Sequence, residues 1–167
     1  MTGRALLLLA LSLALASCGL RPLYSGGANS DAAVALRSVS VGPIPGQSGW
    51  LVRNKLVDRL ATGHSGTPAY RLDVVLDDDL TAFGIRGDRA ATRERRTLRA
   101  RFQLISLSTG TVVLDATAGS DSGIDVVSSE YATVAAEQTA LDQLSDILAD
   151  QIVARLGLFA ARTAPTR

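Results

Sequence analysis

The chain has 167 residues, a formal net charge of +1 and 20% charged residues. This length suits one domain with a modest core, and the composition is globular rather than disordered. A net charge near zero excludes a global attraction to nucleic acid, so any electrostatic binding must come from a local patch.

The first seventeen residues are typical of an export signal and are excluded from the fold. Arg4 precedes the run Ala5–Ala16, which is almost entirely Leu and Ala and is too short for a transmembrane helix. Residues 15–18, Leu-Ala-Ser-Cys, resemble the lipobox of bacterial lipoproteins. That resemblance implies cleavage before Cys18, the only cysteine, and its acylation by a diacylglycerol and an N-linked acyl chain.

Acylation of Cys18 implies a protein held on a membrane by its lipids, since stable anchoring needs more than one chain. Gly19 follows the cysteine, where Asp would retain a lipoprotein in the inner membrane of enteric bacteria. The resemblance therefore implies an outer-membrane location on the periplasmic side. The alternative is a buried core cysteine behind an ordinary signal peptide. Apart from the acyl chains, no cofactor is expected.

The remaining chain is predicted to hold one domain. Residues 18–33 form the lipidated start and a flexible Gly/Ser-rich tether, residues 34–157 the domain, and residues 158–167 a flexible tail. The domain begins with a predicted strand at Val34–Val41, ended by Gly and Pro. A helix capped by Ser48 follows, and its apolar face recurs at helical spacing: Val52, Leu56, Val57 and Leu60.

Three further segments alternate apolar and polar residues with a period of two, which predicts half-buried strands. They begin near Tyr70, Ala91 and Val112. A three-residue turn at 108–110, with Gly110 in the left-handed conformation, would place Leu104 opposite Leu114 and Phe102 opposite Ala116.

The last predicted element is a helix from Glu130 to Leu156, capped by Ser128 or Ser129 and stopped by Gly157. Two amphipathic helices can cover the apolar face of one antiparallel meander. The expected fold is therefore α+β, a two-layer sandwich of order β-α-β-β-β-α. Its roughly four-stranded mixed sheet carries both helices on one face.

Several motifs resemble the LptE family of lipopolysaccharide-assembly lipoproteins from alphaproteobacteria. Cys18–Tyr24 is similar to the family's CGFRPLY start, with Leu20 where Phe is commoner. Residues 128–137 with 148–152 are similar to its S-x-YA-xx-AE … LA-x-xI helix, and residues 107–110 fit its turn. The resemblance implies a non-catalytic subunit that plugs and helps assemble an LptD-type β-barrel and contacts lipopolysaccharide.

Four arginines lie at odd positions of one predicted strand and would project from its polar face: Arg93, Arg95, Arg99 and Arg101. One interpretation is contact with phosphates and carboxylates of lipopolysaccharide or with the barrel, because guanidinium binds such groups in bidentate fashion. The alternative, which can coexist with it, is cross-strand pairing with acids on the neighbouring strands. The acids available are Asp73, Asp77, Asp79, Asp115 and Asp121.

The hairpin tip at residues 85–89 adds Arg86 and Arg89. In the family, a basic residue at this tip is linked to lipopolysaccharide contact, and Arg86 matches it by position. Both are candidate contact residues.

Two other classes of function are open. One is a generic outer-membrane lipoprotein scaffold or envelope-assembly factor that does not involve lipopolysaccharide. The other is a lipid-anchored periplasmic enzyme. The sequence has no Ser-His-Asp order, no Gly-rich phosphate loop and no Cys/His ligand spacing, so no catalysis and no metal are expected. Trp50 and Tyr131 are expected in the core rather than at an interface.

Overall fold

The computed structural model describes residues 35–60, 67–85 and 91–163. The predicted signal peptide, Cys18 and the tether lie outside the described residues, as do Arg86 and Arg89 at the hairpin tip. Those assignments stay predictions.

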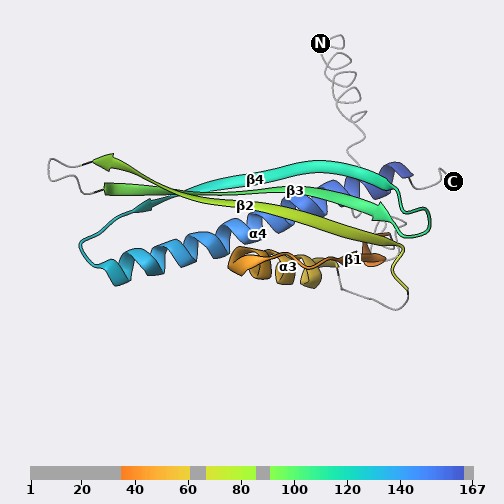
Figure 1. The fold of residues 1–167 in the computed structure, drawn as a ribbon, viewed down its shortest axis with the longest axis horizontal. Helices are drawn as coiled ribbons and strands as arrows, with labels where there is room; N and C mark the ends of the chain where they lie inside the picture. Colours follow the sequence, from red (N-terminus) through yellow and green to blue (C-terminus); the bar gives the residue numbers. More distant parts are fainter. Residues whose placement is uncertain (1–34, 61–66, 86–90, 164–167) are drawn as a thin grey trace, which may run out of the picture.

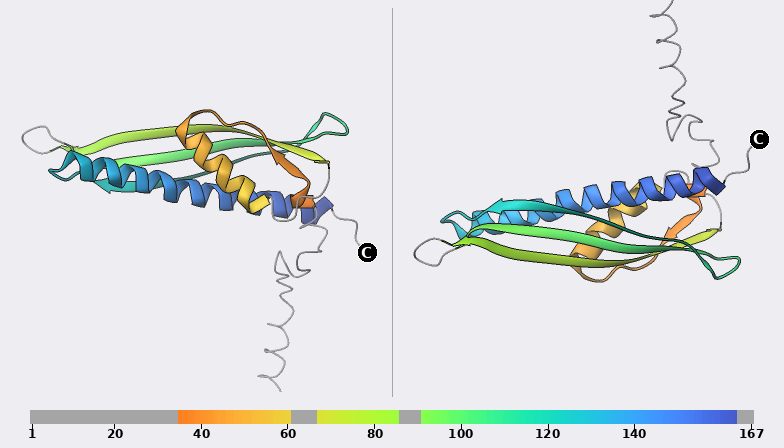
Figure 2. Two further views of the ribbon diagram at one scale, coloured as in Figure 1. Left: turned by 90° about the horizontal axis from the view of Figure 1, so that it is seen from below. Right: turned by 90° about the horizontal axis from the view of Figure 1, so that it is seen from above.

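The fold is a four-stranded sheet with two helices packed on one face (Figures 1 and 2). The strands lie in the order β1-β2-β3-β4, with β1 parallel to β2 and the other pairs antiparallel. This confirms the predicted α+β sandwich, its mixed sheet and its element order. The elements are β1 (Val39–Val41), α3 (Gly46–Leu60), β2 (Tyr70–Ile85), β3 (Ala91–Ser106), β4 (Val112–Asp125) and α4 (Glu130–Thr163).

Strand alternation separates a buried face from an open face of the sheet. The predicted register is confirmed, because Leu104 lies opposite Leu114 and Phe102 opposite Ala116. The even-numbered side chains of β2, β3 and β4 pack against the helices, as does Val39 of β1, and Phe102 is completely buried. The core is completed from the helices by Val52, Leu56, Leu60, Leu141, Leu144, Leu148, Ile152 and Leu156.

Helix α3 starts at Gly46, so the predicted cap at Ser48 is wrong and Ser48 lies inside the first turn. Gly46 has φ +83°, a backbone conformation that glycine adopts without steric cost. One turn further on, a Cβ on Gly49 would lie 2.6 Å from the carbonyl oxygen of Ile44. The Pro-containing segment therefore folds back onto the helix and decides where the helix begins.

The first strand is shorter than predicted, because only Val39–Val41 pairs with β2. Residues 35–37 are helical instead. Ser38 closes this turn by donating its backbone N–H and its hydroxyl to the carbonyl of Ala35, over 3.1 and 2.7 Å. A serine that donates to a nearby backbone carbonyl competes with strand pairing for that carbonyl.

Helix α4 is longer than predicted and continues through Gly157 to Thr163, so the predicted stop is wrong. Gly157 is buried, and two residues later Phe159 makes an edge-to-face contact with Tyr70, with ring centroids 6.4 Å apart. Tertiary packing therefore outweighs the helix-breaking tendency of one glycine. At the other end, the Ser129 hydroxyl accepts the N–H of Ala132 over 3.4 Å, as predicted for a cap.

The turn between β3 and β4 has a different construction from the prediction. The N–H of Ser106 donates to the carbonyl of Thr111, which leaves four residues in the turn rather than three. A bulge then restores the register, because Ile105 pairs with Val112 while Leu104 pairs with Leu114. Gly110 is left-handed as predicted, with φ +69°.

Candidate functional site

The open face of the sheet carries the odd-numbered side chains of β2, β3 and β4, on the side away from both helices (Figure 2). Val75 of β2, opposite Arg101 on β3, is 71% exposed. The four arginines predicted for this face are all there and all exposed: Arg93, Arg95, Arg99 and Arg101. They are called the arginine row below.

Two members of the arginine row are held by acids of β4 at hydrogen-bond distance. Arg93 donates to Asp125 over 3.1 Å, and Arg101 donates to Asp115 over 2.8 Å. Hydrogen bonds from Arg101 and then from Gln103 lower the pKa of Asp115 to about 2. Since these pairs are solvent-exposed, each contributes little to stability, but each reduces the charge available to a ligand.

Arg95 is held less tightly. Its Nε lies 3.7 Å from the carboxylate of Asp121, and its guanidinium lies 5.6 Å from the ring centroid of Phe83 on β2. The pairing alternative therefore applies to three of the four arginines, with acids of the following strand. The acids of β2 do not take part, because Asp73 pairs with Arg71 on its own strand and Asp79 accepts the hydroxyl of Thr81.

Arg99 is the exception in the arginine row. In cross-strand register it lies between Asp77 on β2 and Gly119 on β4. Among the described residues it has no carboxylate within ion-pair distance. Gly119 leaves the space beside it open, since a Cβ there would lie 3.0 Å from Cγ of Arg99. Arg99 therefore keeps its full hydrogen-bonding capacity for a ligand.

The open space around Arg99 is part of a groove of about 750 Å³, called the arginine groove below. Most of its residues lie on β2, β3 and β4, and Gln151 and Arg155 of α4 join them beside the free edge of β4. The residues that define its chemistry are Val75, Asp77, Arg99, Arg101, Asp121 and Arg155. Like Arg99, Arg155 is exposed and has no ion pair within the described ranges.

The position of Arg155 depends on how α4 docks on the sheet. One helical turn earlier, the side-chain amide of Gln151 accepts the N–H of Gly119 over 3.1 Å and donates to its carbonyl over 3.3 Å. This pairing fixes α4 against the free edge of β4. Arg155 follows at i+4, on the same helix face, and so borders the groove.

The face of the sheet toward α4 also carries charge near the start of the helix. Arg96 donates to Asp78 through two nitrogens, over 2.9 and 2.8 Å, and reaches the carbonyl of Glu137 over 3.3 Å. The Oε2 of Glu94 is buried and has no hydrogen-bond partner among the residues that the structure describes. Burial, and then the charge of Glu137, raises the pKa of Glu94.

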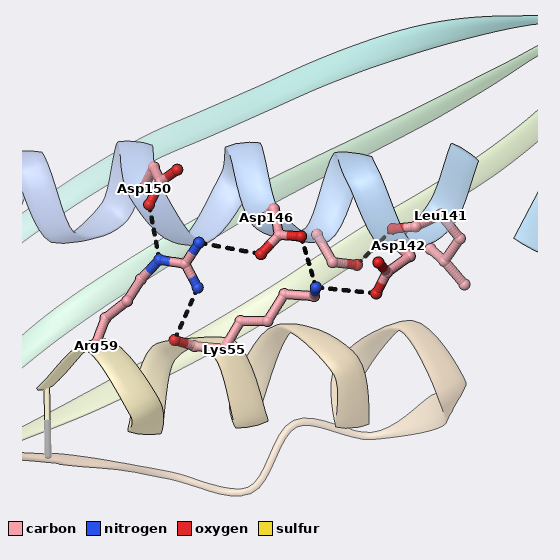
Figure 3. A network of polar contacts seen from close by, with 7 residues as sticks. Lys55, Arg59, Leu141, Asp142, Asp146 and Asp150 are labelled. Atoms are coloured by element: carbon pink, nitrogen blue, oxygen red, sulfur yellow. Dashed lines mark hydrogen bonds and ion pairs between the residues drawn. The ribbon is translucent and has the colours of Figure 1, made fainter. Parts of the chain in front are cut away.

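The two helices are joined by a network of four ion pairs (Figure 3). Lys55 contacts Asp142 and Asp146 over 2.9 and 2.7 Å. Arg59 contacts Asp146 and Asp150 over 3.0 and 2.7 Å. Acids one turn apart on α4 thus face bases one turn apart on α3. The network fixes the α3–α4 contact on the far side of the sheet from the groove.

The alternation of β3 predicted the arginine row, whereas no sequence pattern indicated Gln151, Gly119 or Arg155. A lone exposed Gln or Arg on a helix carries no periodic signal, and the pairing of Gln151 with Gly119 spans 32 positions of sequence. Trp50 and Tyr131, expected in the core, are 63% and 85% exposed. Each lies on the solvent-exposed face of a helix whose opposite face packs in the core.

Neither a membrane-spanning helix nor a metal-binding cluster occurs in the part of the chain that the structure describes. The polar groups of the arginine groove are guanidinium and hydroxyl groups, scattered carboxylates and the amide of Gln151. Chemically, such a groove suits an anion with several oxygen atoms.

A family model described as LptE, lipopolysaccharide-assembly, matches residues 36–156. Among solved structures, a putative lipoprotein from Caulobacter crescentus CB15 has a TM-score of 0.68 at 24% identity, covering 82% of this chain and all (100%) of that one. The rare lipoprotein B of Shewanella oneidensis has a TM-score of 0.56 at 9% identity, with coverage of 74% and 96%.

A minor lipoprotein from Acinetobacter baumannii is similar to the same degree, with a TM-score of 0.55 at 16% identity and coverage of 72% and 91%. At these identities the likeness shows a shared fold. No curated protein matches the chain significantly.

Proposed function

The chain belongs to the LptE family of lipopolysaccharide-assembly proteins, and we propose that it is the lipoprotein subunit of a lipopolysaccharide translocon. In this proposal Cys18 carries the lipid anchor, and the protein lies on the periplasmic side of the outer membrane. There it plugs and helps assemble an LptD-type β-barrel. It also contacts lipopolysaccharide on its way to the outer leaflet.

The observation that carries the lipopolysaccharide contact is Arg99 in the arginine groove, which has no ion pair in the described part of the chain. Lipopolysaccharide presents phosphates and carboxylates close to its acyl chains, and guanidinium binds both groups with charge-assisted hydrogen bonds. Arg155 supplies a second cation without an ion pair among the described residues, on the same groove. The exposed Val75 supplies apolar surface beside them. Arg86 and Arg89 at the hairpin tip stay candidates for a second contact.

The role as a plug is supported by the rigid construction of the domain. The ion pairs between α3 and α4 and the pairing of Gln151 with Gly119 tie both helices to one another and to the sheet. A plug must keep its shape inside a partner, and a filled core with fixed helices provides that. No step of this role needs a reacting group.

The barrel partnership is tested by detergent extraction of a tagged, acylated protein from the native envelope, with mass spectrometry of what copurifies. The expected partner is an LptD-type barrel. Copurification with other envelope proteins, and never with such a barrel, would support the generic scaffold instead. Mass spectrometry of the mature N-terminus tests the acylation of Cys18 in the same preparation.

The lipopolysaccharide contact is tested by Arg99→Gln, with Arg93→Gln as the matched control. Arg99 has no ion pair among the described residues, whereas Arg93 is held by Asp125. A charge-assisted hydrogen bond contributes roughly 1.5 kcal/mol, so Arg99→Gln should weaken binding about tenfold. Arg93→Gln should change it much less. Equal effects of the two substitutions would refute the role of the groove.

A further inference from the structure

One end of the molecule, called the hairpin end below, combines the β3–β4 turn, the last turns of α4 and the beginning of the described chain (Figure 1). Leu107 in the turn donates its N–H to the carbonyl of Ala69 over 2.9 Å. Ala35 and Leu36 line the same small cavity as Phe159 and Thr163 of α4. Three distant segments of sequence therefore meet there.

The hairpin end exposes aliphatic side chains that the fold leaves uncovered. In and beside the turn, Leu107, Val112 and Val113 are 46%, 49% and 36% exposed, and Leu158 on α4 is 48% exposed. The hairpin from Leu104 to Leu114 contains no charged residue. Tips of solvent-facing hairpins are usually polar, so an uncharged tip with three exposed aliphatic residues indicates contact with an apolar phase.

The polar groups of this turn are paired with one another. The hydroxyls of Thr109 and Thr111 lie 2.7 Å apart, and those of Ser106 and Ser108 lie 3.0 Å apart. The N–H of Gly110 donates to the carbonyl of Ser106 over 2.8 Å. Groups that are already hydrogen-bonded cost less to remove from water. The turn can therefore leave water with a smaller penalty than its composition suggests.

The last turns of α4 carry charge of one sign. After Asp150 the sequence contains Arg155, Arg162 and Arg167 and no acid. At the opposite end of the sheet, by contrast, acids and bases alternate, as in the pairs Arg93–Asp125 and Arg96–Asp78. The acids on the strands nearest the tip, Asp73 and Asp115, are paired with Arg71 and Arg101. An apolar tip beside the end of α4 therefore complements a surface of anionic phospholipid, because arginine places its stem on apolar groups and its head at phosphate level.

From these observations we infer that the hairpin end is a membrane-contacting surface. Leu107, Val112 and Val113 enter the interface of the leaflet that holds the lipid anchor, and Arg162 in the last turn of α4 faces its phosphate groups. The inference rests on the proposed acylation of Cys18. The described chain begins at this end, and seventeen residues, from Cys18 to Val34, connect it to the anchor. That length can span at most about 60 Å, so the anchor alone does not fix an orientation; the hairpin would.

The test uses the acylated mature protein in vesicles of phosphatidylethanolamine and phosphatidylglycerol. Trp50, the only tryptophan, is changed to Phe, and one reporter is introduced as Leu107→Trp. Brominated lipids in the vesicles should quench the tryptophan emission. The emission maximum with vesicles should also lie at a shorter wavelength than the maximum in detergent-free buffer without vesicles. Val112→Trp is a second reporter with the same expected result. Tyr131→Trp, at the opposite end of the molecule, is the matched control and should stay unquenched.

Reporters at Leu107 and Val112 that both stay unquenched, in protein shown by mass spectrometry to be acylated, would overturn the inference. A blue-shifted emission that bromolipid does not quench and that disappears on dilution would identify a second copy of the chain as the occupant instead. Copurification of the barrel, which tests the proposed function, is measured in a separate experiment. Quenching without a barrel partner would refute the proposed function alone, and a barrel partner without quenching would refute this inference alone.

Discussion

Gln151 of α4 forms two hydrogen bonds with the backbone of one residue of β4, Gly119. The Gly119 N–H donates to the side-chain oxygen over 3.1 Å, and the side-chain amide donates to the Gly119 carbonyl over 3.3 Å. A neighbouring strand would satisfy the same two groups. Because β4 is the last strand of the sheet, a helix residue here covers part of an open edge.

Gln151→Ala should therefore destabilise the domain by about 1–2 kcal/mol, since two backbone groups lose their partner and each hydrogen bond contributes roughly 1 kcal/mol net. The measurement is urea unfolding followed by circular dichroism. Gln138→Ala is the control, because Gln138 is exposed on the same helix. If both variants lose the same stability, the Gln151–Gly119 pair is not a significant contact.

Gly119→Ala should reduce lipopolysaccharide binding without unfolding the protein. The added Cβ would lie 3.0 Å from Cγ of Arg99 and 3.3 Å from the carbonyl oxygen of Leu98, so the arginine side chain must move. We expect a binding loss comparable to that of Arg99→Gln, about tenfold.

Gly123→Ala on the same strand is the matched control, because its Cβ would meet nothing within 4 Å. That variant should bind as the wild type does. A binding loss in the control, or none in Gly119→Ala, would contradict the assignment of the groove.

Asp146→Asn tests the network between α3 and α4. Asp146 accepts hydrogen bonds from Lys55 and Arg59, and the bond from Lys55 is the main cause that lowers the pKa of Asp146. The substitution should cost about 1 kcal/mol at neutral pH, since the pairs are partly exposed. Asp58→Asn on α3, where the carboxylate is exposed, should cost little.

The effect of Asp146→Asn should depend on pH and salt. A carboxyl with a lowered folded-state pKa stabilises the protein above its unfolded pKa of about 4, and the contribution disappears as pH falls through the lower folded value. The stability difference between wild type and variant should therefore shrink in acid and at high salt. A difference that is constant from neutral to acidic pH would show that packing, and not charge, is responsible.

Glu94→Gln should stabilise the domain at neutral pH. Burial and the charge of Glu137 raise the pKa of Glu94, so the ionised form is disfavoured in the folded state. The wild type therefore loses stability as pH rises through the raised value, and the variant does not. The free energy of unfolding, measured from acid to neutral pH, should be higher for the variant than for the wild type at neutral pH. The two values should become equal below the ordinary pKa of a glutamate, about 4.3.

Glu137→Gln should relieve part of the same unfavourable interaction, and the double variant should gain less than the sum of the two single gains, because the residues are coupled. Additive gains would show that the two carboxylates do not interact.

Periodicity was sufficient to predict the faces of β3 and β4. The alternation in residues 98–104 and 114–118 placed Phe102 opposite Ala116 and all four arginines of the row on the open face. The fold class followed, since one apolar face per element admits few arrangements. The sequence could not show which arginine lacks a partner, because Arg99 differs from Arg101 only in what the neighbouring strand places beside it, Gly119 rather than Asp115 or Thr117.

The ends of elements were the least predictable features. Gly157 has the local character of a helix stop, yet α4 continues because Phe159 packs on Tyr70, a residue of a distant strand. Val34–Val41 has the composition of a strand, yet Ser38 satisfies the carbonyl of Ala35 first. In the first place a contact with a residue far away in the sequence overrode the local tendency, and in the second a local side-chain hydrogen bond competed with strand pairing.

By itself, the sequence determined which side chains share a face, because side-chain direction follows from the two backbone periods alone. It also determined the lack of charge in the β3–β4 hairpin and the single sign of charge after Asp150. The tertiary structure alone decided that Gln151 meets Gly119, that Arg155 joins Arg99 at one groove, and that the hairpin lies beside the end of α4. These contacts join residues far apart in sequence, and only the packing of the helices on a twisted sheet fixes which of them meet.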